Sequence, residues 1–476
     1  MSAVATATRT RAPEAPERGA IPRERVELLC DPGSFMPLRS GVLSDSGGAA
    51  GDGVLAGAGA LDGRPVYCYA QDPKMKGGSL GSSHADSIVR VMRLAGDAGA
   101  PVVGFVESGG ARLQEGHAAL SGYGRIFRAS VELSDRVPQV SVVAGVSAGG
   151  GAYSPALTDF VVMTEDARMF LTGPQIVREA MGEDVGMAEL GGPGVHAGNG
   201  VCQLVAANVP EAVGLTRELL SFLPARIGAR VASMPSRPAN GADPGAPVPS
   251  DPRKVYDVRD VVAAVADDGR LLELDERWAR SMVTGFARIE GRAVGVIANQ
   301  PRRLGGVIDA EAAEKGALFV NRCDRFGIPL VVLVDTPGFM PGTRQEDAGV
   351  IRYGAQLLRA FAAARVPKLT VVLRKAYGGA VITMNSRGLG ADMVFAWPGA
   401  EIGIMAARQA VGIVERRAIA AAPEPDATRD SLAAAYAGEH LSATTAAASG
   451  FVDEVIAPGE TRRRVAWALG ALEGVR

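Results

Sequence analysis

Four continuous apolar runs recur along this chain, and each is bounded by proline or glycine. They predict strands buried on both faces, at Val102–Glu107, Val140–Val146, Leu330–Asp335 and Leu369–Arg374. Helical patterns separate them, at Ser83–Ala98, Tyr123–Leu133, Ala310–Phe326 and Val350–Ala364. The alternation of strand and helix indicates βαβ units with right-handed crossovers, and therefore an α/β fold.

Shorter elements surround these runs. The turn signal Asp62-Gly63 joins two predicted strands, Gly53–Ala60 and Pro65–Gln71. Another strand pair is expected at Phe160–Thr164 and Ala167–Leu171, with further helices at Arg23–Leu29, Pro210–Leu223 and Val258–Ala266. The glycine-rich segment Ser44–Asp52 predicts a loop.

The second half of the chain repeats the pattern of the first. Gly63, Gly77, Pro101 and Gly110 return as Gly291, Gly305, Pro329 and Gly338, always 228 positions later. Gly149-Gly150 returns as Gly378-Gly379, at an offset of 229. Such constant spacing predicts two copies of one domain, each of which ends a buried strand in a Gly-Gly turn.

Composition divides the 476 residues into four parts. Residues 1–22, rich in Ala, Pro, Thr and Arg, are expected to be a disordered tail and not a signal peptide. Six prolines between Pro235 and Pro252 predict a linker at 235–253. The two copies then form an N-terminal domain at 23–234 and a C-terminal domain at 254–476.

Bulk properties exclude several classes of function. A net charge of −2 argues against general nucleic-acid binding, and no apolar run reaches the length of a membrane span. The scattered cysteines Cys30, Cys68, Cys202 and Cys323 form no Cys-x-x-Cys motif, which indicates reduced thiols. We therefore predict a cytoplasmic protein that binds no metal, no nucleic acid and no membrane.

The Gly-Gly turns are the candidate catalytic features. In Ser147-Ala148-Gly149-Gly150-Gly151 and in Ala376-Tyr377-Gly378-Gly379-Ala380, a strand runs into glycines and then a helical pattern. Glycine leaves backbone N–H groups uncovered, so each turn can form an oxyanion hole whose donors are each worth about 3–4 kcal/mol. One such motif is more simply a tight turn, but two at matching positions favour the functional interpretation. We expect a β-branched residue at Gly379 to block the turn.

Two more motifs follow the first long strand of each copy, Ser108-Gly109-Gly110-Ala111-Arg112 and Thr336-Pro337-Gly338-Phe339. Open α/β sheets bind ligands at such strand ends. Arg112 could meet a phosphate or position Glu115, and a buried ion pair that holds the loop is nearly as good an interpretation. Because no histidine lies in a nucleophile-elbow pattern, an enzyme mechanism must use backbone donors and a proton acceptor from elsewhere.

These motifs resemble the carboxyltransferase β subunit of biotin-dependent acyl-CoA carboxylases, nearest to the propionyl-CoA carboxylase type. The resemblance runs from about Arg23 to Thr461 and includes Gly77-Gly78-Ser79-Leu80-Gly81, Tyr153-Ser154-Pro155-Ala156, Gly182-Glu183-Asp184-Val185-Gly186 and Arg374-Lys375-Ala376-Tyr377-Gly378-Gly379-Ala380. It implies two tandem crotonase-like domains with ββα units. It also implies a ring-shaped hexamer, a trimer of dimers, whose sites lie where the N-terminal half of one subunit meets the C-terminal half of another.

The resemblance also implies the chemistry. A carboxyl group moves from carboxybiotin to the α-carbon of a short- or medium-chain acyl-CoA, of the acetyl or propionyl type, through a thioester enolate. The cofactor supplies the base, so no catalytic His or Glu is required. Biotin is expected on a partner, the biotin carboxylase and biotin carboxyl carrier (α) subunit, because the sequence contains no biotin-attachment motif.

Residue roles follow from the same resemblance. The amides of Gly149 and Gly150 would hold the thioester oxygen, and those of Gly379 and Ala380, with Gly378, the ureido oxygen of biotin. The expected substrate-binding residues are Gly78, Ser108, Gly109, Gly110, Arg112, Tyr153, Gly338, Phe339, Gly378 and Ile382.

The chain departs from the family pattern at several positions, including Cys202-Gln203, where close relatives have a His-containing stretch. Ser87 stands where relatives usually carry Lys, which removes a charge that could have met a CoA phosphate. Ala406 and Gln409 replace glycines and add side chains where backbone approach matters. Ile382 stands where propionyl-type relatives tend to have Asp, and its apolar side chain suits a different or longer acyl chain.

Three functions remain open at this point. The first is the carboxyltransferase. The second is an acyl-CoA decarboxylase acting on malonyl- or methylmalonyl-CoA, which the altered segment Ala406–Gln409 motivates. The third is a non-catalytic carboxylase-like subunit, which the two intact Gly-Gly turns make the least favoured.

Overall fold

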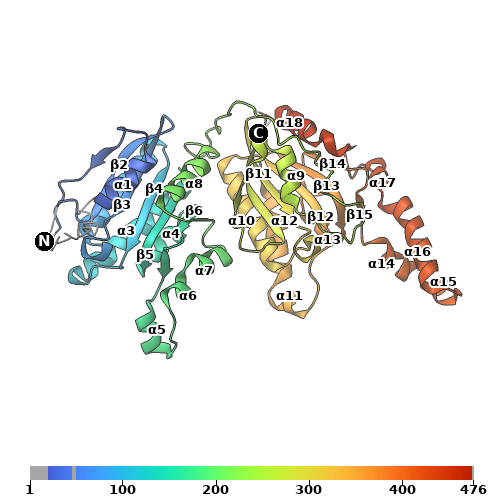
Figure 1. The fold of residues 1–476 in the computed structure, drawn as a ribbon, viewed down its shortest axis with the longest axis horizontal. Coiled ribbons are helices and arrows are strands. Elements are labelled where there is room, and N and C mark those ends of the chain that lie inside the picture. The colour runs from blue at the N-terminus through green and yellow to red at the C-terminus, as the bar shows by residue number, and fades with distance from the viewer. Residues whose placement is uncertain (1–19, 45–49, 474–476) are drawn as a thin grey trace, which may run out of the picture.

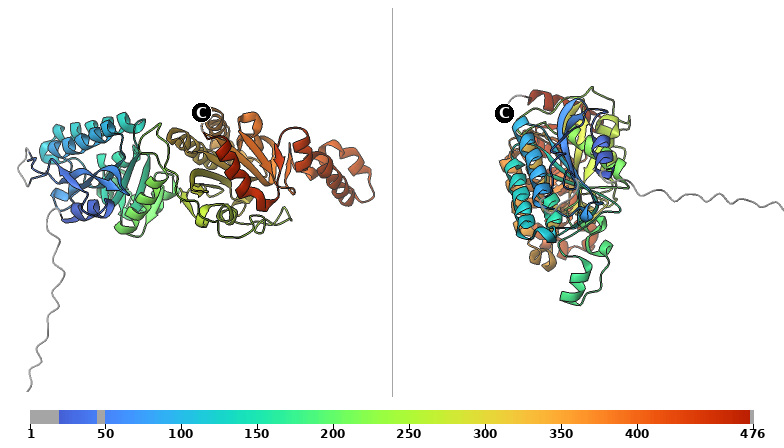
Figure 2. Two further views of the ribbon diagram at one scale, coloured as in Figure 1. Left: turned by 90° about the horizontal axis from the view of Figure 1, so that it is seen from above. Right: turned by 90° about the vertical axis from the view of Figure 1, so that its left-hand side faces the viewer.

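The computed structural model describes residues 20–44 and 50–473. Two α/β domains follow one another along the long axis of the molecule, the first coloured blue to green and the second yellow to red (Figures 1 and 2). Most of the predicted tail and residues 45–49 of the predicted loop Ser44–Asp52 lie outside the described residues.

The first domain contains the elements up to α8. Its strands are β1 (Met36–Leu38), β2 (Val54–Leu61), β3 (Arg64–Gln71), β4 (Val102–Ser108), β5 (Gln139–Ala148), β6 (Phe160–Thr164), β7 (Arg168–Phe170) and β8 (Leu204–Ala206). Its helices are α1 (Ala20–Leu29), α2 (Ser82–Ala98), α3 (His117–Ser134), α4 (Gly150–Ala156), α5 (Pro174–Met181), α6 (Met187–Gly191), α7 (Pro193–Gly198) and α8 (Val209–Ser221).

The second domain repeats this order after the linker. Its strands are β9 (Leu271–Leu274), β10 (Met282–Ile289), β11 (Arg292–Asn299), β12 (Leu330–Thr336), β13 (Lys368–Tyr377), β14 (Met393–Ala396), β15 (Glu401–Gly403) and β16 (Glu454–Val455). Its helices are α9 (Val258–Val265), α10 (Ala310–Phe326), α11 (Thr343–Asp347), α12 (Val350–Ala363), α13 (Gly378–Thr383), α14 (Ala407–Val414), α15 (Arg416–Ala421), α16 (Pro425–Tyr436), α17 (Ala443–Ala448) and α18 (Thr461–Ala471).

The two sheets have the same strand order. The first runs β1-β2-β3-β4-β5-β6-β8 and the second β9-β10-β11-β12-β13-β14-β16, with β7 beside β5 and β15 beside β13. The first three strands of each sheet pair antiparallel, and every later pair is parallel. The carboxyl ends of β4 and β5, and of β12 and β13, therefore meet at one edge of each sheet, where the two Gly-Gly turns lie.

The duplication extends to individual backbone angles. Asp62 has φ of 49° and its equivalent Glu290 has φ of 50°. Gly149 and Gly378, which begin the two Gly-Gly turns, have φ of 59° and 60°. A positive φ is costly for residues other than glycine, so two divergent sequences have kept one backbone path.

The two domains share a hydrophobic core at their boundary. Phe160 of β6 packs against Phe286 of β10 and Phe326 of α10, with ring centroids 6.2 and 6.0 Å apart. Beside them, Arg325 and Asp159 form an ion pair across the boundary. This shared core fixes the two sheets relative to each other.

Equivalent positions on α2 and α10 show how the copies have diverged. Lys315 is 1% exposed, and its ammonium donates to three backbone carbonyls between Asp275 and Met282 at 2.7–3.0 Å. Burial lowers the pKa of Lys315 to about 8. Ser87, which is 228 positions earlier, is also buried, and its hydroxyl accepts from Nε of Arg39 at 3.1 Å. The burial of position 87 argues against the phosphate-binding role that we expected for a lysine there.

The expected pair of ββα domains is confirmed, and most predicted elements occur within a few residues of their expected bounds. One boundary is wrong, because α1 begins at Ala20 and residues 20–22 therefore belong to a helix and not to the predicted tail. The sequence also missed α11 and α18, the latter with Val465 and Leu469 buried, and it missed α5 to α7 and α14 to α17. In α5 no residue is buried and in α14 only two are, so no long apolar stripe marked these helices.

Candidate active site

The first Gly-Gly turn joins β5 to α4. Gly149 has φ of 59° and ψ of −123°, and its N–H donates to the carbonyl of Phe170 at 3.0 Å, which continues the pairing of β5 with β7. Gly150 and Gly151 then begin α4, and the N–H groups in the first turn of a helix lack an intrahelical acceptor. The turn therefore presents the donors of Gly150 and Gly151.

This geometry corrects the predicted donor pair Gly149 and Gly150. The N–H of Gly149 is used inside the sheet, and the offset of 229 makes Gly150 and Gly151 the equivalents of Gly379 and Ala380. Both turns then present N–H groups at the same two positions.

The loop after β4 adjoins the first turn. A Cβ at Gly151 would lie 3.2 Å from the Cβ of Ser108. Ser108 is fully buried, and its hydroxyl lies 3.0 Å from that of Tyr123 and accepts from the N–H of Gly110 at 3.2 Å. Ser108 and Gly110 thus shape the loop from within, while Gly109 is exposed at the site.

Gly78 has a packing role that recurs in the second copy. A Cβ at Gly78 would overlap the carbonyl oxygen of Glu107, and one at its equivalent Gly306 would overlap that of Asp335. These glycines let the loop after β3 or β11 approach the end of β4 or β12. Gly78 is buried at this contact, so the structure assigns it a role in packing.

Arg112 lies in a buried ion-pair network. It is 1% exposed, and its Nη1 is 2.7 Å from Oδ1 of Asp52 and 2.8 Å from Oε1 of Glu115. Its Nη2 donates to the carbonyl of Ser79 at 3.0 Å. The guanidinium therefore holds the loop and positions Glu115, which is the alternative that the sequence left open. Its burial argues against a direct contact with substrate, and the placement of Arg112 among the substrate-binding residues stays a prediction.

Tyr153 is the predicted site residue of the first copy that projects outward. It lies one helical turn after Gly150 on α4 and is 51% exposed. Its ring makes an edge contact with Phe127 of α3, with centroids 6.1 Å apart. A substrate contact for Tyr153 stays a prediction.

The second Gly-Gly turn opens into a cleft. A Cβ at Gly379 would have no atom within 4 Å, whereas Ala380 is fully buried behind it. The cleft has a volume of about 690 Å³ and is also lined by Gly338 and Phe339, from the loop after β12. The structure thus brings Gly338, Phe339, Gly378 and Gly379 together. It also corrects the expectation for Gly379, because the positive φ that requires glycine belongs to Gly378.

Polar side chains line the same cleft, and the sequence did not predict them. The hydroxyl of Tyr377 donates to the carboxylate of Glu401, and burial together with this carboxylate raises the pKa of Tyr377 far above its ordinary value. Burial lowers the pKa of Lys375, whose Nζ donates to the carbonyl of Pro252 at 3.3 Å. The residues before Gly378 carried a signal, since polar side chains there end a buried strand. Glu401 and Pro252 carried none.

A second cavity, of about 500 Å³, adjoins the cleft and shares Gly378, Gly379 and Ile404 with it. Ile382, which is 48% exposed, is part of its lining. The other apolar lining residues are Val381, Ile402, Ala446 and Phe451. The structure therefore places Ile382 in a mainly apolar cavity beside the second turn.

The altered segment Ala406–Gln409 also lines the cleft. Ala406 is the N-cap of α14, with φ of −61°, and Gly173 is the N-cap of α5 in the first copy, with φ of −69°. Because neither angle is positive, alanine fits this backbone without strain. The departure at Ala406 adds a methyl group to the cleft wall and leaves the backbone of the segment intact.

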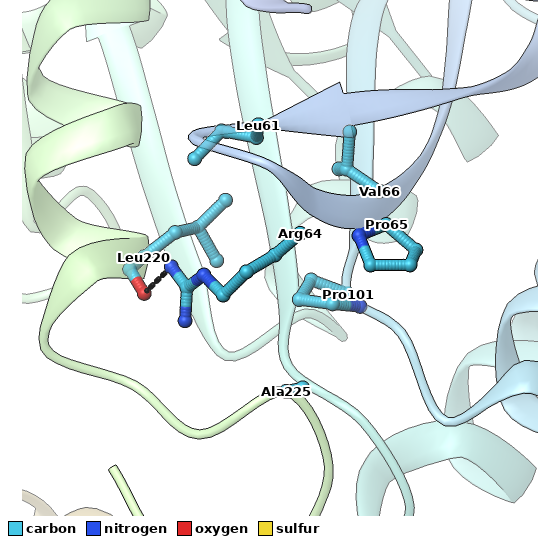
Figure 3. A pocket seen from close by; sticks show the side chains of 7 residues that line it. All are labelled: Leu61, Arg64, Pro65, Val66, Pro101, Leu220 and Ala225. Carbon is cyan, nitrogen blue, oxygen red and sulfur yellow. Dashed lines mark hydrogen bonds between the residues drawn. The ribbon is translucent and has the colours of Figure 1, made fainter. Parts of the chain in front are cut away.

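Other candidate sites are weaker. His84 is fully buried, and burial lowers its pKa to about 3, so it is neutral at pH 7. A cavity of about 10 Å³, where Arg64 donates to the carbonyl of Leu220 at 2.9 Å, holds at most one water (Figure 3). Within residues 20–44 and 50–473, no group of His, Cys, Asp and Glu is arranged to hold a metal ion. No helix in this part is long and apolar enough to cross a membrane.

Comparison with known proteins decides the family, because the carboxyl transferase domain matches residues 13–474. The chain belongs to the carboxyl transferase family. It is 47% identical over 459 residues to the methylmalonyl-CoA carboxyltransferase 12S subunit of Propionibacterium freudenreichii, which covers 94% of this chain and 87% of that protein. It is 44% identical over 470 residues to the propionyl-CoA carboxylase carboxyltransferase subunit of Haloferax mediterranei, with 95% and 90% covered.

The fold of this carboxyl transferase also matches a solved structure. A transcarboxylase 12S crystal structure with methylmalonyl-coenzyme A and methylmalonic acid bound superposes with a TM-score of 0.91 at 45% identity. The match covers 95% of this chain and 89% of that one. The resemblance inferred from the motifs is confirmed, and the chain is an enzyme of acyl-CoA carboxyl transfer.

Proposed function

We propose that this chain is the carboxyltransferase subunit of a biotin-dependent acyl-CoA carboxylase. It moves a carboxyl group from carboxybiotin, held by a biotin carboxyl carrier on a partner, to the α-carbon of an acetyl- or propionyl-type acyl-CoA. One observation carries the proposal: two equivalent turns present backbone donors at Gly150–Gly151 and at Gly379–Ala380. A reaction that forms two oxyanions requires two such sites.

In the first site, the N–H groups of Gly150 and Gly151 bind the thioester oxygen as it gains charge. Loss of one such donor typically lowers kcat by about 10²–10³-fold. The hydrogen bond between Ser108 and Tyr123 holds the neighbouring loop in place. The exposed Gly109 and Tyr153 border the space in which the acyl-CoA lies.

The second site fits the ring system of biotin. Its cleft of about 690 Å³ is in the ordinary range for small-molecule sites, and the empty space at Gly379 lets a planar group approach the backbone. Phe339 and Ile404 supply apolar walls. The N–H groups of Gly379 and Ala380 hold the ureido oxygen. Carboxybiotin supplies the carboxyl group and, once this has left, the base for the α-proton.

Each domain extends an arm beside its turn, α5 to α6 in the first and α14 to α16 in the second (Figure 1). These arms expose apolar residues, among them Ile176 and Met181 on α5 and Ile413 and Val414 on α14. We propose that the arms pack against a second copy, so that the first turn of one subunit faces the second turn of another. A hexamer built from such dimers agrees with the hexamer named for the 12S structure.

The acyl group is proposed to extend toward Ile382. This side chain and its apolar neighbours favour a hydrocarbon over a polar group in the cavity of about 500 Å³. The location of the protein in the cytoplasm stays a prediction.

The function is tested with the purified chain, a carboxylated biotin carrier protein, and acetyl-, propionyl-, butyryl- and octanoyl-CoA. We expect a malonyl-CoA derivative to form from at least one short-chain substrate, and to require the carrier. Failure to carboxylate any of the four would contradict the proposal. Release of CO₂ from malonyl- or methylmalonyl-CoA without biotin would instead identify a decarboxylase.

A further inference from the structure

Arg374 connects the linker between the domains to the second site through hydrogen bonds. Arg374 is 5% exposed, and its Nη1 donates to two linker carbonyls, those of Pro249 and Asp251 at 3.3 and 3.2 Å, and to that of Lys254, directly after the linker, at 2.9 Å. Its Nε donates to Oδ2 of Asp335 at 3.0 Å. The guanidinium therefore joins the linker to the end of β12, where the loop that carries Gly338 and Phe339 begins.

The next residue holds the same segment from the side of the cleft. Nζ of Lys375 donates to the carbonyl of Pro252, and the N–H of Lys375 donates to Oδ1 of Asp335, both at 3.3 Å. Pro252 and Lys375 line the cleft together with Gly379. Pro252 of the linker is thus part of the wall of the second site.

We propose that Arg374 is a positioning residue of this site. It holds the segment Pro249–Lys254 in place, and with it Pro252 in the wall of the cleft, and so sets how tightly the cleft binds biotin; this rests on the proposed function. Arginine suits the task because the five N–H donors of its planar fork can meet a carboxylate and three carbonyls at once, one acceptor more than the three donors of a lysine ammonium. Asp335 is itself fully buried, so it orients the guanidinium without contact to solvent.

The first test is kinetic and uses the full chain. Carboxyl transfer from methylmalonyl-CoA to free biotin is measured for the wild type, Arg374→Lys and Arg374→Met. We expect the KM for biotin to rise roughly tenfold, as the loss of one or two charge-assisted hydrogen bonds would give, while the KM for methylmalonyl-CoA changes less than about twofold. Arg25→Lys is the matched control: Arg25 is also buried, and it pairs with Glu107, the first-copy equivalent of Asp335.

The second test is independent of activity. Trypsin cleaves after Arg253 and Lys254, within the clamped segment, and after Arg230, which lies in the same connection but outside it. Release of the Lys254 carbonyl in Arg374→Met should accelerate cleavage at the first two bonds by about tenfold relative to cleavage after Arg230.

The two tests separate the ways in which the inference can fail. If cleavage accelerates but the KM for biotin does not change, the linker is no wall of the biotin site. If cleavage does not accelerate, Arg374 does not hold the linker. If the wild type transfers nothing from methylmalonyl-CoA to biotin, the KM comparison is repeated with the carboxylated carrier and the four acyl-CoAs; failure there too rejects the proposed function, while the trypsin rates still decide whether the clamp exists. Should Arg374→Met not fold, Arg374→Lys provides both measurements.

Discussion

The two domains keep one backbone but surround their turns differently. In the first, a Cβ at Gly150 would lie 2.7 Å from the ring of Tyr123, so an aromatic side chain closes the space behind the turn. In the second, the equivalent Gly379 has nothing within 4 Å. The geometry of the backbone donors is therefore the shared feature, and the side chains around it are the feature that differs.

The carboxylates before the two site loops show the same divergence. Glu107 pairs with Arg25 of α1 at 2.6 Å, and Asp335 pairs with Arg374 of β13 at 3.0 Å. At the position of Arg374, the first copy has Gly145, where a Cβ would overlap the side chain of Glu107. The longer carboxylate thus fills the space that the missing side chain leaves. Both copies bury and neutralise a charge, but they take the counter-ion from different elements.

The largest effect is expected where both turns need a positive φ. Gly378→Val should lower kcat for carboxyl transfer by about 10²–10³-fold, because a β-branched residue resists φ near 60° and the following N–H groups turn away. Gly149→Val should have a similar effect through the first turn. Steady-state assays measure both.

Gly327→Val serves as the control for these variants. Gly327 also has a positive φ, 68°, but it follows α10 and lines neither the cleft nor the cavity beside it. The kcat of Gly327→Val should stay near that of the wild type. If Gly378→Val and Gly327→Val are equally active, the equivalence of the two turns carries no catalytic meaning.

A smaller effect is expected on stability, and it differs between the equivalent positions on α2 and α10. Lys315→Met should lower the free energy of unfolding by about 2–4 kcal/mol, because three buried carbonyls lose their donor. Ser87→Ala, at the equivalent position, should cost about 1 kcal/mol, since it removes one hydrogen bond from Arg39. Urea unfolding of both variants measures the difference. Equal losses would show that the two positions contribute equally to the free energy of unfolding.

A buried histidine predicts that the first domain is the more sensitive to acid. Burial, with a contribution from Arg112, lowers the pKa of His84 to about 3 from an ordinary 6.5, and the equivalent residue is Ala312. The unfolded chain therefore binds a proton first, so stability is present above pH 6.5 and is lost as the pH falls toward 3.

The loss should reach about 2–3 kcal/mol between pH 6.5 and pH 4.5. Urea unfolding of the wild type and of His84→Gln at both pH values measures it. His84→Gln should lose less stability by that amount. Identical pH dependence in the two proteins would exclude His84 as the source.

The smallest effect concerns the space behind the turns. Gly150→Ala should lower the free energy of unfolding by about 1–2 kcal/mol through overlap with Tyr123, and Gly150→Ala/Tyr123→Leu should recover part of this. Gly379→Ala should change it by less than about 0.5 kcal/mol. Thermal unfolding distinguishes these outcomes. A larger loss of stability for Gly379→Ala than for Gly150→Ala would contradict the proposed difference in space behind the two turns.

The fold was predictable because its signals are local and repeated. The apolar runs of β4, β5, β12 and β13 lie between proline and glycine, and the glycines recur at constant offsets. Glycines such as Gly63 and Gly291 predict turns because few other residues adopt a positive φ. The short helices of the two arms were not predicted because they bury few side chains.

The site was predictable in position but not in detail, because its details depend on distant partners. The N–H of Gly149 is used by Phe170, through a strand pairing that no spacing reveals. Arg112 meets Asp52, which is 60 positions earlier, so its burial could not be deduced from its own motif. Tyr377 meets Glu401 from another strand for the same reason.

The contacts between Arg374 and the linker determine where the chain can be divided into its two domains. A fragment that begins at residue 254, where composition places the second domain, would lack the carbonyls of Pro249, Asp251 and Pro252. Arg374 would keep only the Lys254 carbonyl and Asp335 as partners, and Nζ of Lys375 would lose its acceptor in the linker. A module that can be exchanged between relatives must therefore carry the segment before it. The natural point of division lies upstream of Pro249, inside what looked like a spacer.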